Sequence, residues 1–134
     1  AVPAAFSAAL AAIPAGDDAL SSAFAAALPV YFADFWARQD DFAPFRAAVR
    51  MYAEPAGAPD PVLFDVRDRL GAITAPTVVI GGRHDFLCGP VWAHRLAEGI
   101  PGARLTMLER SGHFGHVEQP AEFADAAASV LSGT

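Results

Sequence analysis

Two segments carry the residues whose side chains could do acid–base chemistry. The first, residues 81–85, ends in Asp85, and the second, residues 110–116, contains His113. An aspartate that orients an imidazole and a histidine that takes a proton make up two thirds of a hydrolytic triad. Taken singly, an aspartate in a loop is more often a turn residue and a histidine beside glycine a solvated one. The spacing alone therefore leaves catalysis open.

The elements around these segments indicate how the two side chains could meet. Residues 75–82 form a β-branched run bounded by proline and Gly-Gly, which predicts a fully buried, parallel strand. Residues 103–108 predict a second strand. Because both segments follow a strand, they leave the same edge of the sheet, where ligands bind in open α/β folds. We therefore expect Asp85 and His113 to converge.

Helices are predicted between and after these strands. Gly89-Pro90 opens one helix, with Trp92, Leu96 and Ile100 on one face. Gln119-Pro120 opens the last helix, for which we expect four inward residues: Phe123, Ala127, Val130 and Leu131. The order strand, helix, strand, helix is an α/β pattern.

The first half of the chain, to about Glu54, has helical apolar spacing and many aromatic residues. Three short helices are predicted, at about residues 17–28, 32–36 and 42–52. Pairs of aspartates could cap the first and third: Asp17 and Asp18, and Asp40 and Asp41. The aromatic residues favour a helical core over a ligand pocket. Residues 54–61 have the composition of a turn or linker.

Composition excludes several classes of protein. The chain has 134 residues, of which 54% are hydrophobic and 18% charged, so disorder is not expected. The net charge of −6 gives no basic surface for nucleic acid or an anionic membrane. The single Cys88 excludes an internal disulfide. No apolar run reaches the length of about 18 residues needed to span a bilayer, and we expect a cytoplasmic protein.

The stretch from about Leu70 to Leu131 resembles the C-terminal part of the α/β-hydrolase superfamily. The matching segments are residues 75–85, 100–103, 111–113 and 117–120, which read APTVVIGGRHD, IPGA, SGH and VEQP. The resemblance implies that Asp85 is the triad acid and His113 the triad base, in the chain order of that family. It implies no metal and no organic cofactor.

The resemblance also implies a domain organisation. Residues 1–60 look like a helical cap or lid, and residues 61–134 like the C-terminal segment of the hydrolase core. Substrate-binding residues are expected in both parts: Phe35, Trp36, Phe86 and Phe114. The cap and residues 84–90, which read HDFLCGP, look most like hydrolases of the proline-iminopeptidase type.

The sequence departs from the family at the nucleophile. The family serine lies in a G-x-S-x-G elbow, and none of the serines here has that glycine spacing. We therefore expect the C-terminal portion of a longer serine hydrolase that cleaves ester, amide or N-terminal prolyl bonds and is inactive as this chain alone. Its expected partner is the missing N-terminal half, or a second copy through an exposed sheet edge. The alternatives are a non-catalytic binding module, and a dehalogenase or C–C hydrolase of the same fold.

Other reactive residues have simpler interpretations. Cys88 has no glycine elbow to present it as a nucleophile and is expected to be a small residue near the pocket. His84, Asp85, His113 and His116 could suggest a metal site, but the H-x-x-H spacing alone is poor evidence and we expect none. Glu118 is expected at a helix entry, where a carboxylate favours the dipole. One of Asp40, Asp41 and Glu54 could recognise a substrate amine, although solvated helix starts fit these residues better.

Overall fold

A computed structural model of the chain describes residues 16–53 and 65–131. The chain divides into two compact units, Ala1–Val62 and Leu63–Thr134. The expected linker, residues 54–61, lies outside the described residues.

The described part of the first unit is helical. Its elements are the α-helix α2 (Asp17–Ala27), the 3₁₀ helix η1 (Leu28–Tyr31) and the α-helix α3 (Ala43–Ala48). The expected helix at residues 32–36 does not form, because Phe32 adopts extended backbone (φ −104°, ψ 151°) and ends η1. The expected helix at residues 42–52 is shorter, since Val49 is again extended. The residues that precede the two α-helices are Gly16 and Phe42 rather than the expected aspartates.

Aromatic rings fill the core of this unit. Phe32, Phe35 and Phe42 are buried, and the rings of Phe32 and Phe42 stack with their centroids 4.3 Å apart. The segment after α3 runs back along α2, where the hydroxyl of Ser21 bonds to both backbone groups of Met51. The sequence-based expectation of an aromatic core is confirmed for these residues.

The second unit is an α/β structure. Its elements, in chain order, are η2 (Arg67–Ala72), β1 (Val78–Gly82), α4 (Pro90–Gly99), β2 (Arg104–Leu108), α5 (Gly115–Glu118) and α6 (Pro120–Ala128). β1 and β2 pair in parallel, from Val78 opposite Arg104 to Gly82 opposite Leu108. The predicted strands and the two predicted helices are therefore present, and α5 is an additional short helix.

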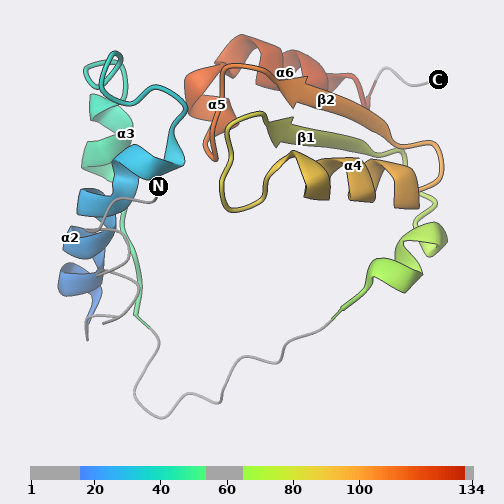
Figure 1. Cartoon of the computed structure of the whole chain (residues 1–134), viewed down its shortest axis with the longest axis horizontal. Helices are drawn as coiled ribbons and strands as arrows, with labels where there is room; N and C mark the ends of the chain where they lie inside the picture. Colours follow the sequence, from blue (N-terminus) through green and yellow to red (C-terminus); the bar gives the residue numbers. More distant parts are fainter. Residues whose placement is uncertain (1–15, 54–64, 132–134) are drawn as a thin grey trace. The chain divides into compact units, whose positions relative to one another are not determined.

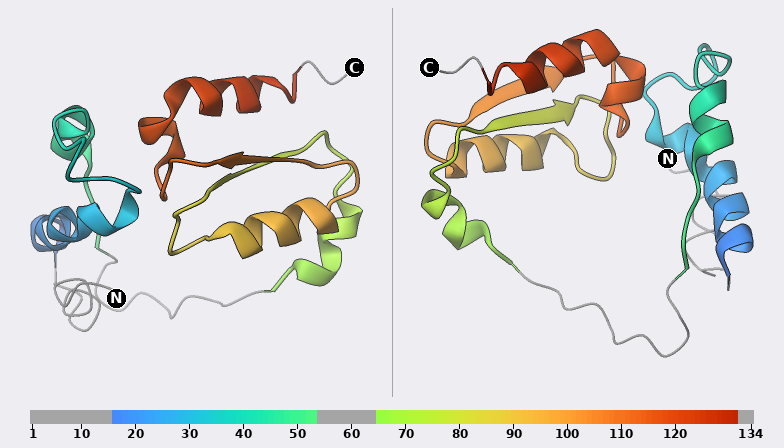
Figure 2. Two further views of the ribbon diagram at one scale, coloured as in Figure 1. Left: turned by 45° about the horizontal axis from the view of Figure 1, so that its top comes forward. Right: turned by 180° about the vertical axis from the view of Figure 1, so that it is seen from behind.

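The sheet of this unit lies between two helices. Figure 1 and the left view of Figure 2 show α4 on one face of β1 and β2 and α6 on the other. The buried apolar side chains of this unit come from η2, from the two strands, from α4 with its C-cap and from α6: Leu70, Val79, Ala93, Ile100, Leu108 and Ala126. The three layers hold the two strands in place, so the loops that follow the strands have a fixed origin.

Burial differs from the sequence-based expectation in two places. Val79 is buried, whereas Val78 and Ile80 are half-buried. Within residues 65–131, β1 has a strand neighbour on only one of its two sides, so part of the strand is left uncovered. α6 ends at Ala128, so Leu131 lies beyond the helix and is exposed, and Ala126 rather than Ala127 faces the core.

Two short segments explain how the helices start and how the chain turns. Pro90 follows Gly89 at the first position of α4, where its missing N–H costs no intrahelical bond. Gly102, with φ +72°, provides the left-handed turn that leads into β2.

None of the helices in residues 16–53 and 65–131 combines the length and the apolar character that a membrane crossing requires.

Candidate functional site

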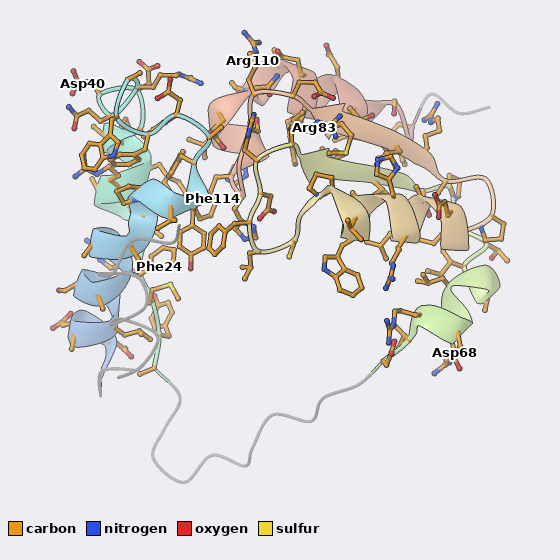
Figure 3. The ribbon with its side chains drawn as sticks, viewed as in Figure 1. Phe24, Asp40, Asp68, Arg83, Arg110 and Phe114 are labelled. Carbon is orange, nitrogen blue, oxygen red and sulfur yellow. The ribbon has the colours of Figure 1, made fainter. Side chains whose placement is uncertain are left out.

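The candidate site lies where β1 and β2 end. Both strand arrows point to the same end of the sheet, and the segment after β1 and the segment between β2 and α5 begin there (Figure 1). Figure 3 labels Arg83 and Arg110, one in each of these segments, at this end of the sheet. Parallel pairing thus brings together Asp85 and His113, which are 28 residues apart in the sequence.

Both carboxylate oxygens of Asp85 are used. Oδ1 accepts the backbone N–H groups of Leu87 at 2.8 Å and Cys88 at 3.0 Å, which closes a turn after the aspartate. Oδ2 lies 2.9 Å from Nδ1 of His113. The Asp85 side chain is only 7% exposed, whereas that of His113 is 29% exposed. The structure therefore places an oriented imidazole at the surface, with its carboxylate beneath it.

The environment of Asp85 favours its ionised form. Burial, the largest single effect, raises the pKa of this carboxyl, but hydrogen bonds from Cys88, His113 and Leu87 together outweigh it. The pKa of Asp85 is therefore held below its ordinary value. A carboxylate that stays charged at neutral pH can orient the imidazole and stabilise its protonated form.

The segment that carries His113 is fixed by the side chains of two consecutive residues. Oε2 of Glu118 accepts the N–H of Gly112 at 2.6 Å, directly before His113. Oε1 of Gln119 accepts the N–H of Arg110 at 2.8 Å and the hydroxyl of Ser111 at 2.9 Å. Glu118 and Gln119 are both buried. Glu118 therefore does more than favour a helix dipole, as the sequence suggested, because its carboxylate holds the base-bearing segment in position.

The backbones of the two segments also meet directly. The N–H of Arg83 donates to the carbonyl of Leu108 at 3.0 Å, and the N–H of His84 donates to the carbonyl of Ser111 at 2.9 Å. These bonds continue the strand pairing beyond the ends of β1 and β2. A Cβ atom at Gly82 would lie 2.0 Å from the carbonyl oxygen of Gly112, so only glycine permits this approach.

An exposed ion pair joins the same two segments. Nε and Nη2 of Arg83 donate to the two carboxylate oxygens of Glu109 at 2.7 and 2.6 Å. This hydrogen-bonded pairing lowers the pKa of Glu109. Both side chains are largely exposed, so water screens the pair and its contribution to stability is small.

A cavity of about 250 Å³ opens beside the Asp85–His113 pair. Its lining combines these two polar residues with the imidazole of His116, the thiol of Cys88, apolar side chains and four glycines. The residues are Val79, Ile80, Gly81, Gly82, Asp85, Cys88, Trp92, Ala93, Leu96, Leu108, Gly112, His113, Gly115, His116 and Phe123. The predicted position of Cys88 near a pocket is therefore confirmed.

The expected substrate-binding residues fall into different surroundings. Phe35 lies in the core of the first unit, and the neighbouring Trp36 is exposed. Phe86 is 40% exposed in the turn after Asp85. Phe114 directly follows His113, and the two rings meet edge to face with centroids 5.3 Å apart. Within the second unit, Phe114 is thus in direct contact with the candidate base.

The metal set suggested by the sequence is not the one that the structure assembles. Within the described residues, donor atoms of Asp85, Cys88 and His113 gather within 4.8 Å of one another, and this group includes neither His84 nor His116. Sequence reasoning gave Gln119 as part of the matching segment 117–120 and as the residue before Pro120, but missed its hydrogen bonds to Arg110 and Ser111. The one signal in the sequence was a side-chain amide at a helix entry, nine residues after Arg110.

Comparison with known proteins identifies the family. Residues 1–126 match the profile of the alpha/beta hydrolase family. The chain belongs to this family. The predicted fold class, the C-terminal portion of an α/β-hydrolase fold, is confirmed by that match and by solved hydrolase structures.

Individual relatives have several named activities. The chain is 42% identical over 60 residues to "Putative carbamate hydrolase RutD" of Rhizobium rhizogenes, covering 45% of this chain and 23% of that protein. It is 34% identical over 87 residues to a 2-hydroxy-6-oxononadienedioate/2-hydroxy-6-oxononatrienedioate hydrolase of Cupriavidus pinatubonensis, covering 65% and 30%. The enol-lactonase of Burkholderia xenovorans superimposes with a TM-score of 0.66 and 25% identity, covering 92% of this chain and 48% of that structure.

A proline iminopeptidase of Lacticaseibacillus rhamnosus is also similar, with 38% identity over 60 residues that span 45% of this chain and 20% of that enzyme. The matched segment of this chain thus spans less than a third of each of these curated relatives. The similarity to α/β hydrolases predicted from the sequence is confirmed, and the activities of the full-length relatives remain statements about those proteins.

Proposed function

We propose that this chain supplies the acid and the base of a hydrolase triad, with Asp85 as the acid and His113 as the base. The observation that carries the proposal is the 2.9 Å contact between Asp85 Oδ2 and His113 Nδ1. Because Nδ1 is bonded to the carboxylate, Nε2 is the ring nitrogen that would exchange a proton with the nucleophile and the leaving group. Phe114 packs against the same ring and would help to keep it in this orientation.

The proposed nucleophile is a serine supplied from outside these 134 residues. The sequence contains no G-x-S-x-G elbow, and the amide donors of an oxyanion hole belong to that elbow and to an earlier loop. In the proposed reaction, His113 removes the serine proton during attack on a carbonyl carbon. His113 then returns that proton to the leaving group, and water releases the acyl group in the second half of the reaction. This chain alone is expected to be inactive.

The proposed substrates contain an ester, amide or N-terminal prolyl bond. Relatives named as a carbamate hydrolase, an enol-lactonase and a proline iminopeptidase support this range, since each name denotes a carbonyl bonded to oxygen or nitrogen. Cleavage of a C–C bond beside a ketone is a second candidate. It is favoured by the 87-residue similarity to a hydrolase of 2-hydroxy-6-oxo acids. Both reactions would use the same acid–base pair.

The proposed partner is the hydrolase segment that carries the nucleophile elbow. Within the described residues β1 has one strand neighbour, and the cavity beside it is lined by the apolar side chains of Val79, Trp92 and Leu96. The superposition on the lactonase covers 92% of this chain but 48% of that enzyme, so the other half of such a hydrolase is large enough to cover this edge. Association of two copies of this chain is the competing outcome.

The test is reconstitution of activity. The chain is joined in one polypeptide, or mixed, with a hydrolase segment that contains an elbow, and ester, prolyl-amide and 6-oxo-acid substrates are assayed. We expect turnover that falls by about 10⁴-fold in His113→Ala. His84→Ala is the matched control, since His84 is exposed and takes no part in the Asp85 contact. Full activity in His113→Ala would refute the assignment, and reconstitution without any turnover would favour the non-catalytic binding module.

A further inference from the structure

Three different metal-ligating side chains converge at the end of β1. A carboxylate oxygen of Asp85, the sulfur of Cys88 and a ring nitrogen of His113 lie within 4.8 Å of one another. All three residues line the same cavity, and Cys88 is exposed. The arrangement therefore combines three donors with an open approach from solvent.

The local hydrogen bonds explain why Cys88 belongs to this group. Oδ1 of Asp85 accepts the N–H of Cys88 at 3.0 Å, and Oδ2 lies 2.9 Å from the His113 ring. One carboxylate thus fixes both the backbone that carries the thiol and the imidazole. The cysteine is three residues after the aspartate, so the turn itself brings the sulfur back toward the carboxylate.

We propose that Asp85, Cys88 and His113 form an inhibitory binding site for a divalent cation of the Zn²⁺ type. Thiolate, imidazole and carboxylate are the ligands that zinc uses, with bonds of about 2.0 to 2.3 Å. Tetrahedral bonds of that length separate the ligand atoms by about 3.3 to 3.7 Å. The exposed thiol can reach that separation by side-chain rotation, and water can take the fourth position. Mg²⁺ and Ca²⁺, which prefer oxygen ligands, are poor matches for this set.

Binding of the ion would oppose the proposed acid–base function. The cation bonds to the thiolate, the carboxylate and the neutral imidazole, and the thiol proton is released to solvent. An ion held between Asp85 and Nδ1 of His113 takes the place of the Nδ1 proton, which moves to Nε2 of the neutral ring. Nε2 then carries a proton and cannot accept one from the nucleophile. The hydrolase would therefore be switched off by zinc without any change at its nucleophile. No oxidant or reductant takes part in this step.

Metal binding is measured first on the 134-residue chain, independently of enzymatic activity. Zn²⁺ is titrated in competition with a chromophoric chelator, and Cd²⁺ is used to observe thiolate-to-metal charge-transfer absorbance. We expect one ion per chain, no competition by Mg²⁺, and an affinity at least about tenfold lower in Cys88→Ser and His113→Ala. The matched controls are His116→Ala, which alters the same cavity outside the trio, and His94→Ala, at an exposed position of α4. Both should bind zinc as the unaltered chain does.

Several outcomes would overturn the proposal. These are the absence of a thiolate absorbance band, full affinity in folded Cys88→Ser or His113→Ala, or an equal loss in the two controls. Circular dichroism confirms that each variant is folded. In a reconstituted hydrolase, the zinc concentration for half inhibition should rise at least about tenfold in Cys88→Ser. Because the first measurement needs no turnover, a failed metal site and a failed hydrolase assignment are distinguishable.

Discussion

At the scale of single residues, Asp85 makes hydrogen bonds of two kinds in the candidate site. Its two oxygens make three hydrogen bonds, two to the turn that it begins and one to the imidazole of His113. The aspartate is thus a structural residue and an orienting residue at once. Removal of the carboxylate charge is expected to affect the fold as well as any chemistry at His113.

This dual use predicts a specific dependence of stability on pH. The pKa of Asp85 is lower in the folded chain than the ordinary value of about 3.9 that the unfolded chain has. Its contribution to stability is therefore complete above roughly pH 5 and is lost as the pH falls through the folded pKa. Urea denaturation between about pH 2 and pH 6 should show this loss, and Asp85→Asn should show a weaker pH dependence. An equal weakening in Asp125→Asn, an exposed aspartate of α6, would contradict the attribution.

At the scale of elements, the site depends on how closely the segments after the two strands approach each other. Backbone bonds from Arg83 and His84 extend the strand pairing, and Gly82 leaves room for the carbonyl of Gly112. Glu118 and Gln119 then hold the His113 segment from the side of α5. Backbone groups and the buried side chains of Glu118 and Gln119 thus position the candidate base.

Gly82→Ala tests the close approach. The new Cβ would lie 2.0 Å from the carbonyl oxygen of Gly112, so one of the two segments must move. We expect a loss of about 1–3 kcal/mol or more in the free energy of unfolding, measured by urea denaturation. Gly71→Ala is the matched control, because a Cβ there meets no atom within 4 Å and its stability should change by less than about 0.5 kcal/mol. Equal effects of the two substitutions would show that the contact at Gly82 is unimportant.

Glu118→Ala tests the support from α5. The change leaves the buried N–H of Gly112 without its 2.6 Å acceptor, which should destabilise the fold by about 1–3 kcal/mol. Glu118→Gln keeps a carbonyl acceptor at the same place and should lose clearly less. The two variants are compared by urea denaturation and by NMR signals of the His113 ring. If Glu118→Gln were as damaging as Glu118→Ala, the hydrogen bond to Gly112 would not be the cause.

The sequence predicted the elements of the second unit well, because strong local signals mark them. Pro and Gly-Gly bound the β1 run, and Pro90 and Pro120 open α4 and α6. The meeting of Asp85 with His113 followed from parallel pairing alone. In contrast, the support from Glu118 depends on the direction of a buried side chain across a turn, which has no local signal in the sequence. The helices predicted for the first unit were too long. Extended backbone at Phe32 and Val49 ends the helices although the apolar spacing continues.

At the scale of the whole molecule, the second unit leaves an apolar strip beside β1. Trp92 and Leu96 of α4 are 46% and 40% exposed, and both line the cavity with Val79. Burial of such a strip is favourable by roughly 25 cal/mol per Å² of apolar surface. A partner that adds a strand at this edge would cover the strip and bring its own groups to the Asp85–His113 pair.

Docking at the open edge of β1 should change the hydrogen exchange of its backbone amides. A hydrolase segment that carries the elbow should slow hydrogen exchange in β1 more than in β2, because it is expected to pair with the open side of β1. NMR exchange rates with and without that segment provide the measurement. Protection that appears instead at high concentration of this chain alone would indicate association of two copies. Unchanged exchange in β1 under both conditions would refute docking at this edge.

The backbone bonds between the two segments have a consequence for how substrates could be admitted. Backbone hydrogen bonds of Arg83, His84, Leu108 and Ser111 tie the two segments together, and Asp85 ties the His113 ring to its own turn. The proposed acid and base are therefore expected to move together with the sheet. In the proposed hydrolase, any opening that lets a substrate in or a product out is then expected to be a movement of other parts around a stationary Asp85–His113 pair. An engineer who altered those surrounding parts could change access and specificity while the spacing of the proton-transfer pair stayed constant.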